Sequence, residues 1–236
     1  MNVAIVVAAG QGTRLGGDQP KQFLELRGVP IVIHTLRQFE RCAEINEIIV
    51  VVPAEHTAAF SSLAEKFEVR KLSRVVSGGA TRAQSVLCGL NAIGNAEVVA
   101  VHDGVRPFVT PDEIDRAVAA ALVSGAAILV APVADTIKDV ENGQVKRTSP
   151  RNDLRRALTP QCFRYDLLRR AYDQLAEIEA AGIEVTDDSF LVERLGAEIL
   201  AVEGSARNIK ITQAEDLAWA EAILKQESGF RSQNPE

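Results

Sequence analysis

The sequence has few cysteines, few aromatic residues and no excess of positive charge. Its 236 residues include three cysteines, 5% aromatic residues, and 26 Lys+Arg against 32 Asp+Glu. The cysteines are odd in number and form no Cys-x-x-Cys pair, which argues against a disulfide framework or a zinc knuckle and favours the reducing cytoplasm. The net charge of -6 argues against general binding to nucleic acids or anionic membranes, because such proteins normally carry a basic excess.

A long, uninterrupted hydrophobic run is also missing. The longest apolar stretch, residues 117–134, is interrupted by Ser124-Gly125 and by Pro132. These breaks predict a helix end, a turn and a buried strand rather than a membrane span. The chain enters a Val- and Ala-rich run at Val3 without a basic lead-in, so we expect a first strand there and no signal peptide.

Short apolar runs rich in Val and Ile alternate with helical patterns. The runs predict buried parallel strands at residues 3–8, 48–52, 98–101, 126–131 and 197–202. Helices are expected after Pro30, Gly79 and Pro111, and over residues 165–180 and 214–225. This alternation predicts an α/β fold with a mostly parallel sheet flanked by helices, whose ligands bind at the carboxyl ends of the strands. We expect a single domain over residues 1–226 and a polar tail over 227–236.

Residues 133–150 break the alternation. Two segments of alternating polarity surround Asn142-Gly143, a pair typical of a β-hairpin turn. An isolated two-stranded hairpin is marginally stable in water. We therefore expect this hairpin, called the β-arm below, to protrude from the domain and to pack against a second subunit.

A glycine-rich loop with cations follows the first strand. It contains Gly10, Gly12 and Arg14, and Lys21 comes shortly after it. Backbone N–H groups of such a loop can approach phosphates without hindrance from Cβ atoms, and the cations can neutralise them. The dinucleotide fingerprint and the Walker A loop both fit poorly, because the third glycine falls one place late and Gly-Lys-Ser/Thr is absent. The pattern favours a nucleotidyltransferase.

Further polar motifs occur where a parallel sheet would bring them to its carboxyl edge. The segment of residues 77–85 opens a helix with free N–H groups for a base or phosphate, although a simple helix cap explains it equally well. Asp103 and Arg106 follow the third sheet strand. Lys210 adds a cation after the last strand, although a single lysine is usually a solvated surface group. We expect His102 to be a structural hydrogen-bonding residue.

Taken in order, these motifs resemble those of the 2-C-methyl-D-erythritol 4-phosphate cytidylyltransferases of the non-mevalonate isoprenoid pathway. The resemblance extends from Val6 to about Leu224. Its motifs are Ala-Ala-Gly-x-Gly-x-Arg with Pro-Lys-Gln, Gly-Gly-x-x-Arg-x-x-Ser, His-Asp-x-x-Arg-Pro, Asp-Thr-Ile-Lys, and Leu-Thr-Pro-Gln with a later Asn-Ile-Lys. It implies a Rossmann-like domain that dimerises through the β-arm, Mg²⁺, and transfer of CMP from CTP to a sugar-alcohol phosphate with release of pyrophosphate.

The resemblance also implies roles for individual residues. The catalytic residues would be Arg14, Lys21 and Lys210. The nucleotide-binding residues would be Ala8, Ala9, Gly10, Gly12, Gly79, Ala80, Ser85 and Asp103. The sugar-alcohol phosphate would contact Asp103, Arg106, Thr136, Arg151 and Thr159, partly across the dimer. Because Arg207 takes the place often held by an acid, Mg²⁺ would be held mainly by CTP phosphates and water, with Asp103 as the candidate protein ligand.

Other functions remain open from the sequence. A ribitol 5-phosphate cytidylyltransferase shares the CTP motifs and differs in the sugar pocket around Arg106, Thr136 and Arg151. A non-catalytic nucleotide-binding regulator could keep the fold, but it would not need Arg14, Lys21 and Lys210 together. A dinucleotide dehydrogenase is disfavoured because the second strand ends without the acidic residue that holds a ribose.

Overall fold

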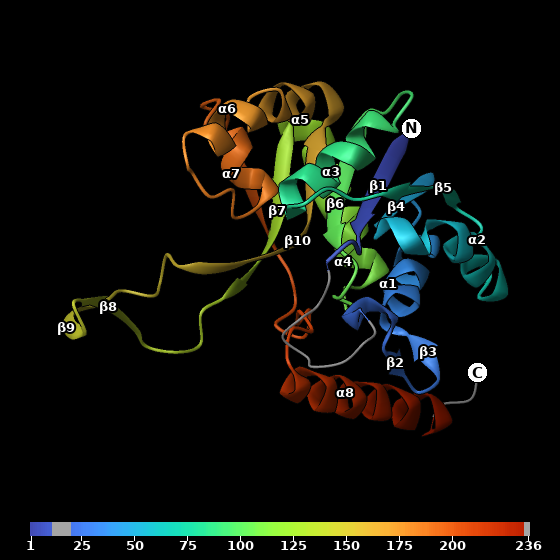
Figure 1. Ribbon diagram of the computed structural model, residues 1–236. Helices are drawn as coiled ribbons and strands as arrows, with labels where there is room; N and C mark the ends of the chain where they lie inside the picture. Colours follow the sequence, from blue (N-terminus) through green and yellow to red (C-terminus); the bar gives the residue numbers. More distant parts are fainter. Residues whose placement is uncertain (11–19, 234–236) are drawn as a thin grey trace.

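A mostly parallel sheet forms the centre of the protein. The computed structural model describes residues 1–10 and 20–233, with side chains as far as residue 226. Within that part of the chain, seven strands form the sheet in the order β11 (Leu200–Glu203), β7 (Ala126–Pro132), β10 (Arg155–Arg164), β6 (Val98–Asp103), β1 (Asn2–Val7), β4 (Glu47–Val52) and β5 (Leu72–Ser77) (Figure 1). Neighbours are parallel except at β10, which runs antiparallel to β6 and β7. The predicted α/β fold class is confirmed.

The strand at the sheet's β11 edge differs from the prediction. A buried strand was expected over residues 197–202, but β11 begins at Leu200, which is 50% exposed. The prediction of burial is wrong because β11 pairs with β7 alone and packs only partly against the helices. Strands β5 and β10 were not predicted, since neither carries a continuous apolar run.

Helices cover both faces of the sheet. One face carries α1 (Ile31–Glu40), α2 (Thr57–Lys66) and α4 (Pro111–Ser124), and the other carries α3 (Arg82–Asn91), α5 (Tyr165–Tyr172), α6 (Leu175–Ala180) and α7 (Asp188–Glu193). Successive residues of a strand point to opposite faces. In β1, Ala4 and Val6 therefore join one hydrophobic core, whereas Val3 and Ile5 join the other.

The strand order creates a switch point at β1 and β6, with a crevice beyond the carboxyl ends of these two strands. From β1 the chain continues to β4 and β5 on one side, and it then returns to add β6 on the other side of β1. Helix α1, which follows β1, lies on one face, and α3, which precedes β6, lies on the opposite face. Ligands of such folds bind at this switch point, beyond the carboxyl ends of the strands. The last residues of these strands, Val7 and Asp103, are partners in the sheet register and face that place.

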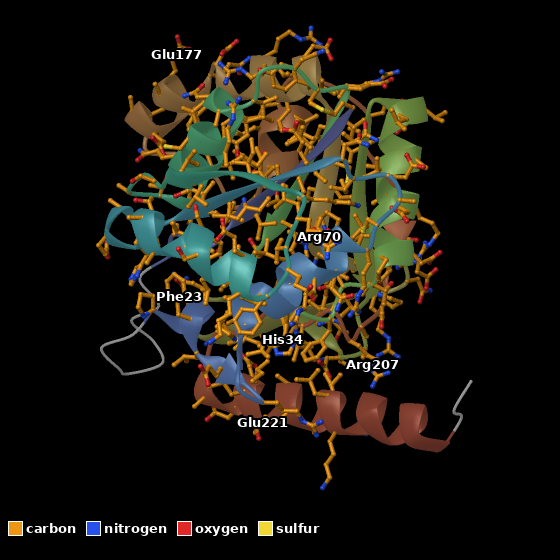
Figure 2. The ribbon with its side chains drawn as sticks, turned by 90° about the vertical axis from the view of Figure 1, so that its right-hand side faces the viewer. Phe23, His34, Arg70, Glu177, Arg207 and Glu221 are labelled. Atoms are coloured by element: carbon orange, nitrogen blue, oxygen red, sulfur yellow. The ribbon has the colours of Figure 1, made fainter. Side chains whose placement is uncertain are left out.

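A short hairpin and the C-terminal helix cover one end of the sheet. The hairpin consists of β2 (Glu25–Leu26) and β3 (Val29–Pro30), and α8 (Ala214–Gln233) crosses this end with Glu221 on its outer side (Figure 2). Leu26 and Ala220 share a hydrophobic cluster there. Helix α8 continues past its expected end at residue 225, because no proline interrupts it before Pro235. No helix in the described part of the chain is long and apolar enough to cross a membrane.

The predicted β-arm is present and extends away from the sheet (Figure 1). It consists of antiparallel β8 (Ile137–Glu141) and β9 (Gln144–Ser149). Asn142 and Gly143 both adopt positive φ, at 51° and 76°, as a tight hairpin turn requires. Val140 and Val145 are 60% and 62% exposed. The arm thus leaves apolar side chains uncovered in a single chain.

The cysteines are free thiols, as the sequence predicts. Cys42 and Cys162 are buried, and Cys88 is partly buried. Burial is the main cause that raises the pKa of the Cys42 thiol to about 12, and burial also raises the pKa of Cys162. Both buried thiols therefore stay protonated and act as small apolar core residues.

Candidate active site

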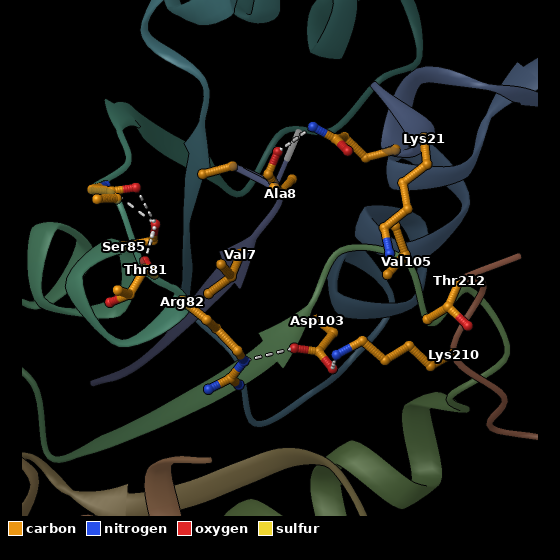
Figure 3. Close-up of a pocket in the computed structure, with 15 residues that line it drawn as sticks. Val7, Ala8, Lys21, Thr81, Arg82, Ser85, Asp103, Val105, Lys210 and Thr212 are labelled. Atoms are coloured by element: carbon orange, nitrogen blue, oxygen red, sulfur yellow. Dashed lines mark hydrogen bonds and ion pairs between the residues drawn. The ribbon is translucent and has the colours of Figure 1, made fainter. Parts of the chain in front are cut away.

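A cavity of about 850 Å³ lies beyond the carboxyl ends of β1 and β6. Its walls come from the end of β1, the segment that opens α3, the end of β6 and the segment before α8 (Figure 3). Among the predicted nucleotide-binding and catalytic residues, those that line it are Ala8, Ala9, Gly10, Lys21, Gly79, Ala80, Ser85, Asp103 and Lys210. Gly12 and Arg14 lie outside the described residues. The structure thus brings together residues that are up to about 200 positions apart in the sequence.

Asp103 is the centre of a buried charge network. Its Oδ1 accepts a hydrogen bond from Nε of Arg82 at 3.0 Å, and its Oδ2 lies 3.2 Å from Nε of Arg106 and 3.0 Å from Nζ of Lys210. Figure 3 shows Arg82 and Lys210 approaching this carboxylate from opposite sides. Burial opposes ionisation, but the attraction of Arg82, Lys210 and Arg106 outweighs it and holds the pKa of Asp103 well below its usual range. Asp103 is therefore ionised and fixes the cations around it.

Another carboxylate holds Arg82 from its far side. Nη2 of Arg82 donates to Oδ2 of Asp188 at 2.8 Å, and the hydroxyl of Tyr172 donates to Oδ1 at 2.5 Å. Asp188 is fully buried, and its backbone N–H donates to Oε1 of Gln161. Asp187 caps the start of α7, and the sequence analysis gave no sign of the ion pair that the next residue, Asp188, forms. Arg82 and Asp188 are 106 residues apart, so no local pattern links them.

The charge network around Asp103, called the cation cluster below, carries an excess of positive charge. Arg82, Arg106 and Lys210 bring three positive charges, whereas Asp103 and Asp188 bring two negative ones. Lys21 adds a further cation to the cavity wall. A positive potential inside a partly closed cavity attracts polyanions and stabilises negative charge that develops during a reaction. This local excess contrasts with the net charge of -6 for the whole chain.

His102 and Thr159 form a chain of hydrogen bonds that ends at the backbone of Asp103. The N–H of Asp103 donates to Oγ1 of Thr159 at 3.2 Å, and Oγ1 lies 3.0 Å from Nδ1 of His102. Because the carbonyl of Arg106 only accepts, Nε2 of His102 donates to it, and Nδ1 accepts from the Thr159 hydroxyl. Complete burial lowers the pKa of His102 to about 3, so the imidazole is neutral. The predicted structural role of His102 is confirmed.

Close backbone packing shapes the cavity wall. A Cβ atom on Gly78 would lie 2.3 Å from Cβ of Ala9, so only glycine allows this approach of the β5–α3 loop to the end of β1. On the other side, Nε2 of buried Gln22 donates to the carbonyl of Ala8 at 2.7 Å. Gln22, which the sequence analysis assigned no role, therefore fixes the start of the glycine-rich loop.

The residues predicted to contact the sugar-alcohol phosphate are more dispersed. Arg106 lies beside the cavity, where its Nη1 donates to the carbonyl of Asn208 at 2.9 Å. Thr159 is 4% exposed, and its hydroxyl is engaged within the network described above. Thr136 and Arg151 flank the β-arm, and neither is among the residues that line the cavity of the same chain. The guanidinium of Arg151 donates to the carbonyl of Ala134. The binding roles of these residues stay predictions.

The described residues offer limited protein ligands for a metal. Within residues 1–10 and 20–233, no group of three or more His, Cys, Asp or Glu could hold a metal ion. Among the residues that the structure describes, Asp103 is the carboxylate that lines the cavity, and both of its oxygens already contact cations. A divalent ion in this cavity would therefore need ligands from a substrate and from water.

Comparisons with known proteins agree with the fold and show the family. The family model described as "IspD: 2-C-methyl-D-erythritol 4-phosphate cytidylyltransferase" matches residues 2–226. A relative of that name from Bacillus velezensis is 46% identical over 228 residues, which cover 96% of this chain and 97% of the relative. A 4-diphosphocytidyl-2C-methyl-D-erythritol synthase from Anaerococcus prevotii superposes with a TM-score of 0.83 and 32% identity, over 95% of this chain and 96% of that one. A 2-C-methyl-D-erythritol 4-phosphate cytidylyltransferase from Thermus thermophilus gives 0.76 and 36%, over 95% and 100%. The chain belongs to the 2-C-methyl-D-erythritol 4-phosphate cytidylyltransferases, a family of nucleotidyltransferase enzymes.

Proposed function

We propose that the cavity binds CTP and 2-C-methyl-D-erythritol 4-phosphate, and that the chain transfers CMP from the first to the second. The products are 4-diphosphocytidyl-2-C-methyl-D-erythritol, an intermediate of isoprenoid biosynthesis, and pyrophosphate. The observation that carries the proposal is the positively charged cluster around Asp103, which faces the small-residue wall of Gly79 and Ala80 in one cavity. The first part suits phosphates and the second suits a flat base.

The chemistry needs positive charge more than it needs a base. The nucleophile is a phosphate monoester whose second pKa of about 6 leaves it anionic at neutral pH, so no protein group has to remove a proton. The neutral, buried state of His102 agrees with this, because its pKa of about 3 makes it unfit as a base. Crowding of negative charge at the α-phosphorus is the obstacle, and cations lower it. Lys21 and Lys210, together with Arg14, would stabilise the pentacoordinate transition state and the leaving pyrophosphate.

Backbone groups would recognise the nucleotide. The wall that would admit the cytosine consists of Ala8, Ala9, Gly79, Ala80 and Ser85. Gly10 and Gly12 would offer backbone groups to the phosphates. The hydroxyl of Ser85 accepts from the N–H of Gly79 at 3.2 Å and donates to the carbonyl of Thr81 at 2.9 Å. These two hydrogen bonds hold the backbone of residues 79–81 in place, which supports recognition of the base by backbone groups of this segment. Asp103 would hold ligand hydroxyls.

The sugar-alcohol phosphate site would be completed by a second subunit. Arg106 and Thr159 lie beside the cavity, whereas Thr136 and Arg151 flank the two strands of the β-arm, which extends away from it (Figure 1). A homodimer in which each arm enters the neighbouring site would cover Val140 and Val145 and would bring Thr136 and Arg151 to the acceptor. The exposure of these valines supports the dimer.

Mg²⁺ fits this cavity as an ion that arrives with the phosphates. It prefers oxygen ligands and retains several waters, so phosphate oxygens with water satisfy it, and Asp103 is the protein carboxylate within reach. The ion would neutralise phosphate charge. A cytoplasmic location, expected from the cysteine usage, remains a prediction.

A pyrophosphate-release assay tests the function. With CTP, Mg²⁺ and 2-C-methyl-D-erythritol 4-phosphate we expect turnover that depends on the acceptor. Parallel reactions with ribitol 5-phosphate separate the two acceptors, since preferential turnover of ribitol 5-phosphate would favour the alternative enzyme. CTP binding by calorimetry without pyrophosphate release for either acceptor would instead favour a non-catalytic regulator.

A further inference from the structure

Residues 77–81, the β5–α3 loop, separate the nucleotide cavity from another cavity behind it. Gly79, Ala80 and Thr81 line the nucleotide cavity. The cavity behind the loop has a volume of about 650 Å³ and is lined by Thr81 to Gln84, by Glu179 and by residues 182–186. The loop therefore has open space behind it rather than a packed core. On the side of this cavity the loop is held by polar contacts, because the close packing that normally prevents a segment from shifting is missing there.

Glu179 of α6 provides such contacts. Its Oε1 accepts a hydrogen bond from the hydroxyl of Thr81 at 3.1 Å, and its Oε2 accepts from Nε2 of Gln84 at 2.8 Å. A carboxylate only accepts, so it turns the amide of Gln84 with its NH₂ group toward Glu179 and its oxygen toward the loop. That oxygen, Oε1, accepts from the N–H of Ala80 at 3.1 Å. The Thr81 hydroxyl also caps α3 by accepting from the N–H of Gln84 at 3.0 Å.

The two ends of the loop are fixed by other means. Gly78 donates its N–H to the carbonyl of Val52 in β4 at 2.9 Å, and Arg82 is held by Asp103 and Asp188. The middle of the loop depends on Ser85 and on the contacts that Glu179 organises. A change at Glu179 should therefore move the middle of the loop without disturbing the cation cluster.

We infer that Glu179 is a positioning residue that sets the affinity and the base selectivity of the nucleotide site without touching the nucleotide. The inference rests on the proposed function, because it takes this cavity to be the CTP site. Gly79 and Ala80 offer only backbone groups to a base, so discrimination depends on where the loop holds those groups. Hydrogen bonds weaken steeply when distance or angle departs from the optimum, and selectivity for a base falls with them.

The test compares Glu179→Gln with Glu177→Gln. Both residues belong to α6, and Glu177 is exposed at the outer surface of the molecule (Figure 2). After wild-type turnover has established the activity, we expect E179Q to raise KM for CTP about tenfold and to lower the preference for CTP over UTP by a similar factor. The KM for the acceptor and kcat should stay within about twofold of wild type, and E177Q should match wild type throughout.

A double-mutant cycle with Gln84→Met tests whether Glu179 acts through Gln84. If it does, Q84M and E179Q together should raise KM for CTP no more than the stronger single variant. A lower melting temperature of E179Q with an unchanged KM for CTP and unchanged CTP preference would show a merely structural role and overturn the inference. If the wild type shows no turnover, the proposed function fails. CTP affinity measured by calorimetry then decides on Glu179: weaker CTP binding by E179Q supports its role, and equal binding overturns it.

Discussion

At the scale of single residues, Lys210 is held by an ion pair and is still accessible from the cavity, as its proposed catalytic role requires. Its Nζ lies 3.0 Å from Asp103, and its side chain remains 38% exposed to the cavity. Since its charge would act mainly on the transition state, Lys210→Ala should lower kcat by about 10²- to 10³-fold with the fold retained. Steady-state kinetics and circular dichroism check this. Lys66→Ala, on the exposed side of α2, serves as the control, and a wild-type kcat for Lys210→Ala would contradict the role.

His102 should make stability depend on pH. Its folded pKa of about 3 lies below the ordinary value of 6.5, so its contribution is complete above about pH 6.5 and decreases as the pH falls toward 3. Asp103, whose folded pKa is depressed, loses its contribution only below about pH 3.8. Urea unfolding should therefore give a free energy about 2 kcal/mol lower at pH 5 than at pH 7 from His102. His102→Gln should remove that difference, and an unchanged pH dependence in this variant would contradict the assignment.

Sequence patterns predicted the residues of the cavity better than the contacts among them. Lys21, Asp103 and Lys210 each follow a strand or a glycine-rich loop, and the topology of a parallel sheet brings such positions together. The role of Arg82 was missed because its partners lie 21 and 106 residues away. The signal available was its place five residues into the Gly-Gly motif. Burial, which gives Asp188 its importance, is not visible in a polar segment of sequence.

At the scale of elements, the pair Arg82 and Asp188 joins α3 to α7. Because Asp188 is fully buried, water cannot replace its charge. Asp188→Asn would therefore leave the guanidinium of Arg82 with one carboxylate partner, Asp103, instead of two. We expect the free energy of unfolding to fall by about 3 kcal/mol. Denaturant unfolding measures this, with Asp173→Asn at the exposed end of α5 as the matched control. A loss no larger than that of the control would show that the pair contributes little.

The elements that could be predicted are those whose burial is uniform. Strands β1, β4, β6 and β7 are buried on both faces, so their sequences are nearly continuous apolar runs. Edge strand β5 is exposed in places, and β10 begins with exposed arginines before it enters the core. Neither sequence therefore shows a continuous apolar run or a regular alternation of apolar and polar residues. The β-arm was predictable for another reason, since Asn142 and Gly143 satisfy the positive φ angles of its turn locally.

At the scale of the whole molecule, the charges are segregated. The chain carries a net charge of -6, yet the cavity is lined by Lys21, Arg82 and Lys210, with Arg106 beside it on Asp103. A negative exterior repels nucleic acids, whereas a local positive field attracts small phosphorylated ligands. Residues 146–170 add eight Arg or Lys against two Asp. The β-arm itself, residues 133–150, holds three Lys or Arg against three Asp or Glu, so the excess of positive charge lies after the arm, over residues 151–170.

Complementation between subunits tests where the β-arm acts. Lys21→Ala disables the cavity and Arg151→Ala disables the arm, so each variant alone should be nearly inactive. If arms enter the neighbouring subunit's site, a mixed dimer contains one site with both parts intact. Random assortment in equal amounts makes half of the dimers mixed, so co-refolded protein should recover about a quarter of wild-type activity.

The control for this experiment mixes Lys21→Ala with Lys210→Ala. Both residues line the cavity of one chain, so every site in that mixture keeps a defect and no activity should return. Light scattering on each preparation verifies that dimers are present. Recovery in neither mixture, despite confirmed dimers, would mean that Arg151 serves its own chain. The β-arm would then have to fold back toward its own cavity, against the direction in which it extends (Figure 1).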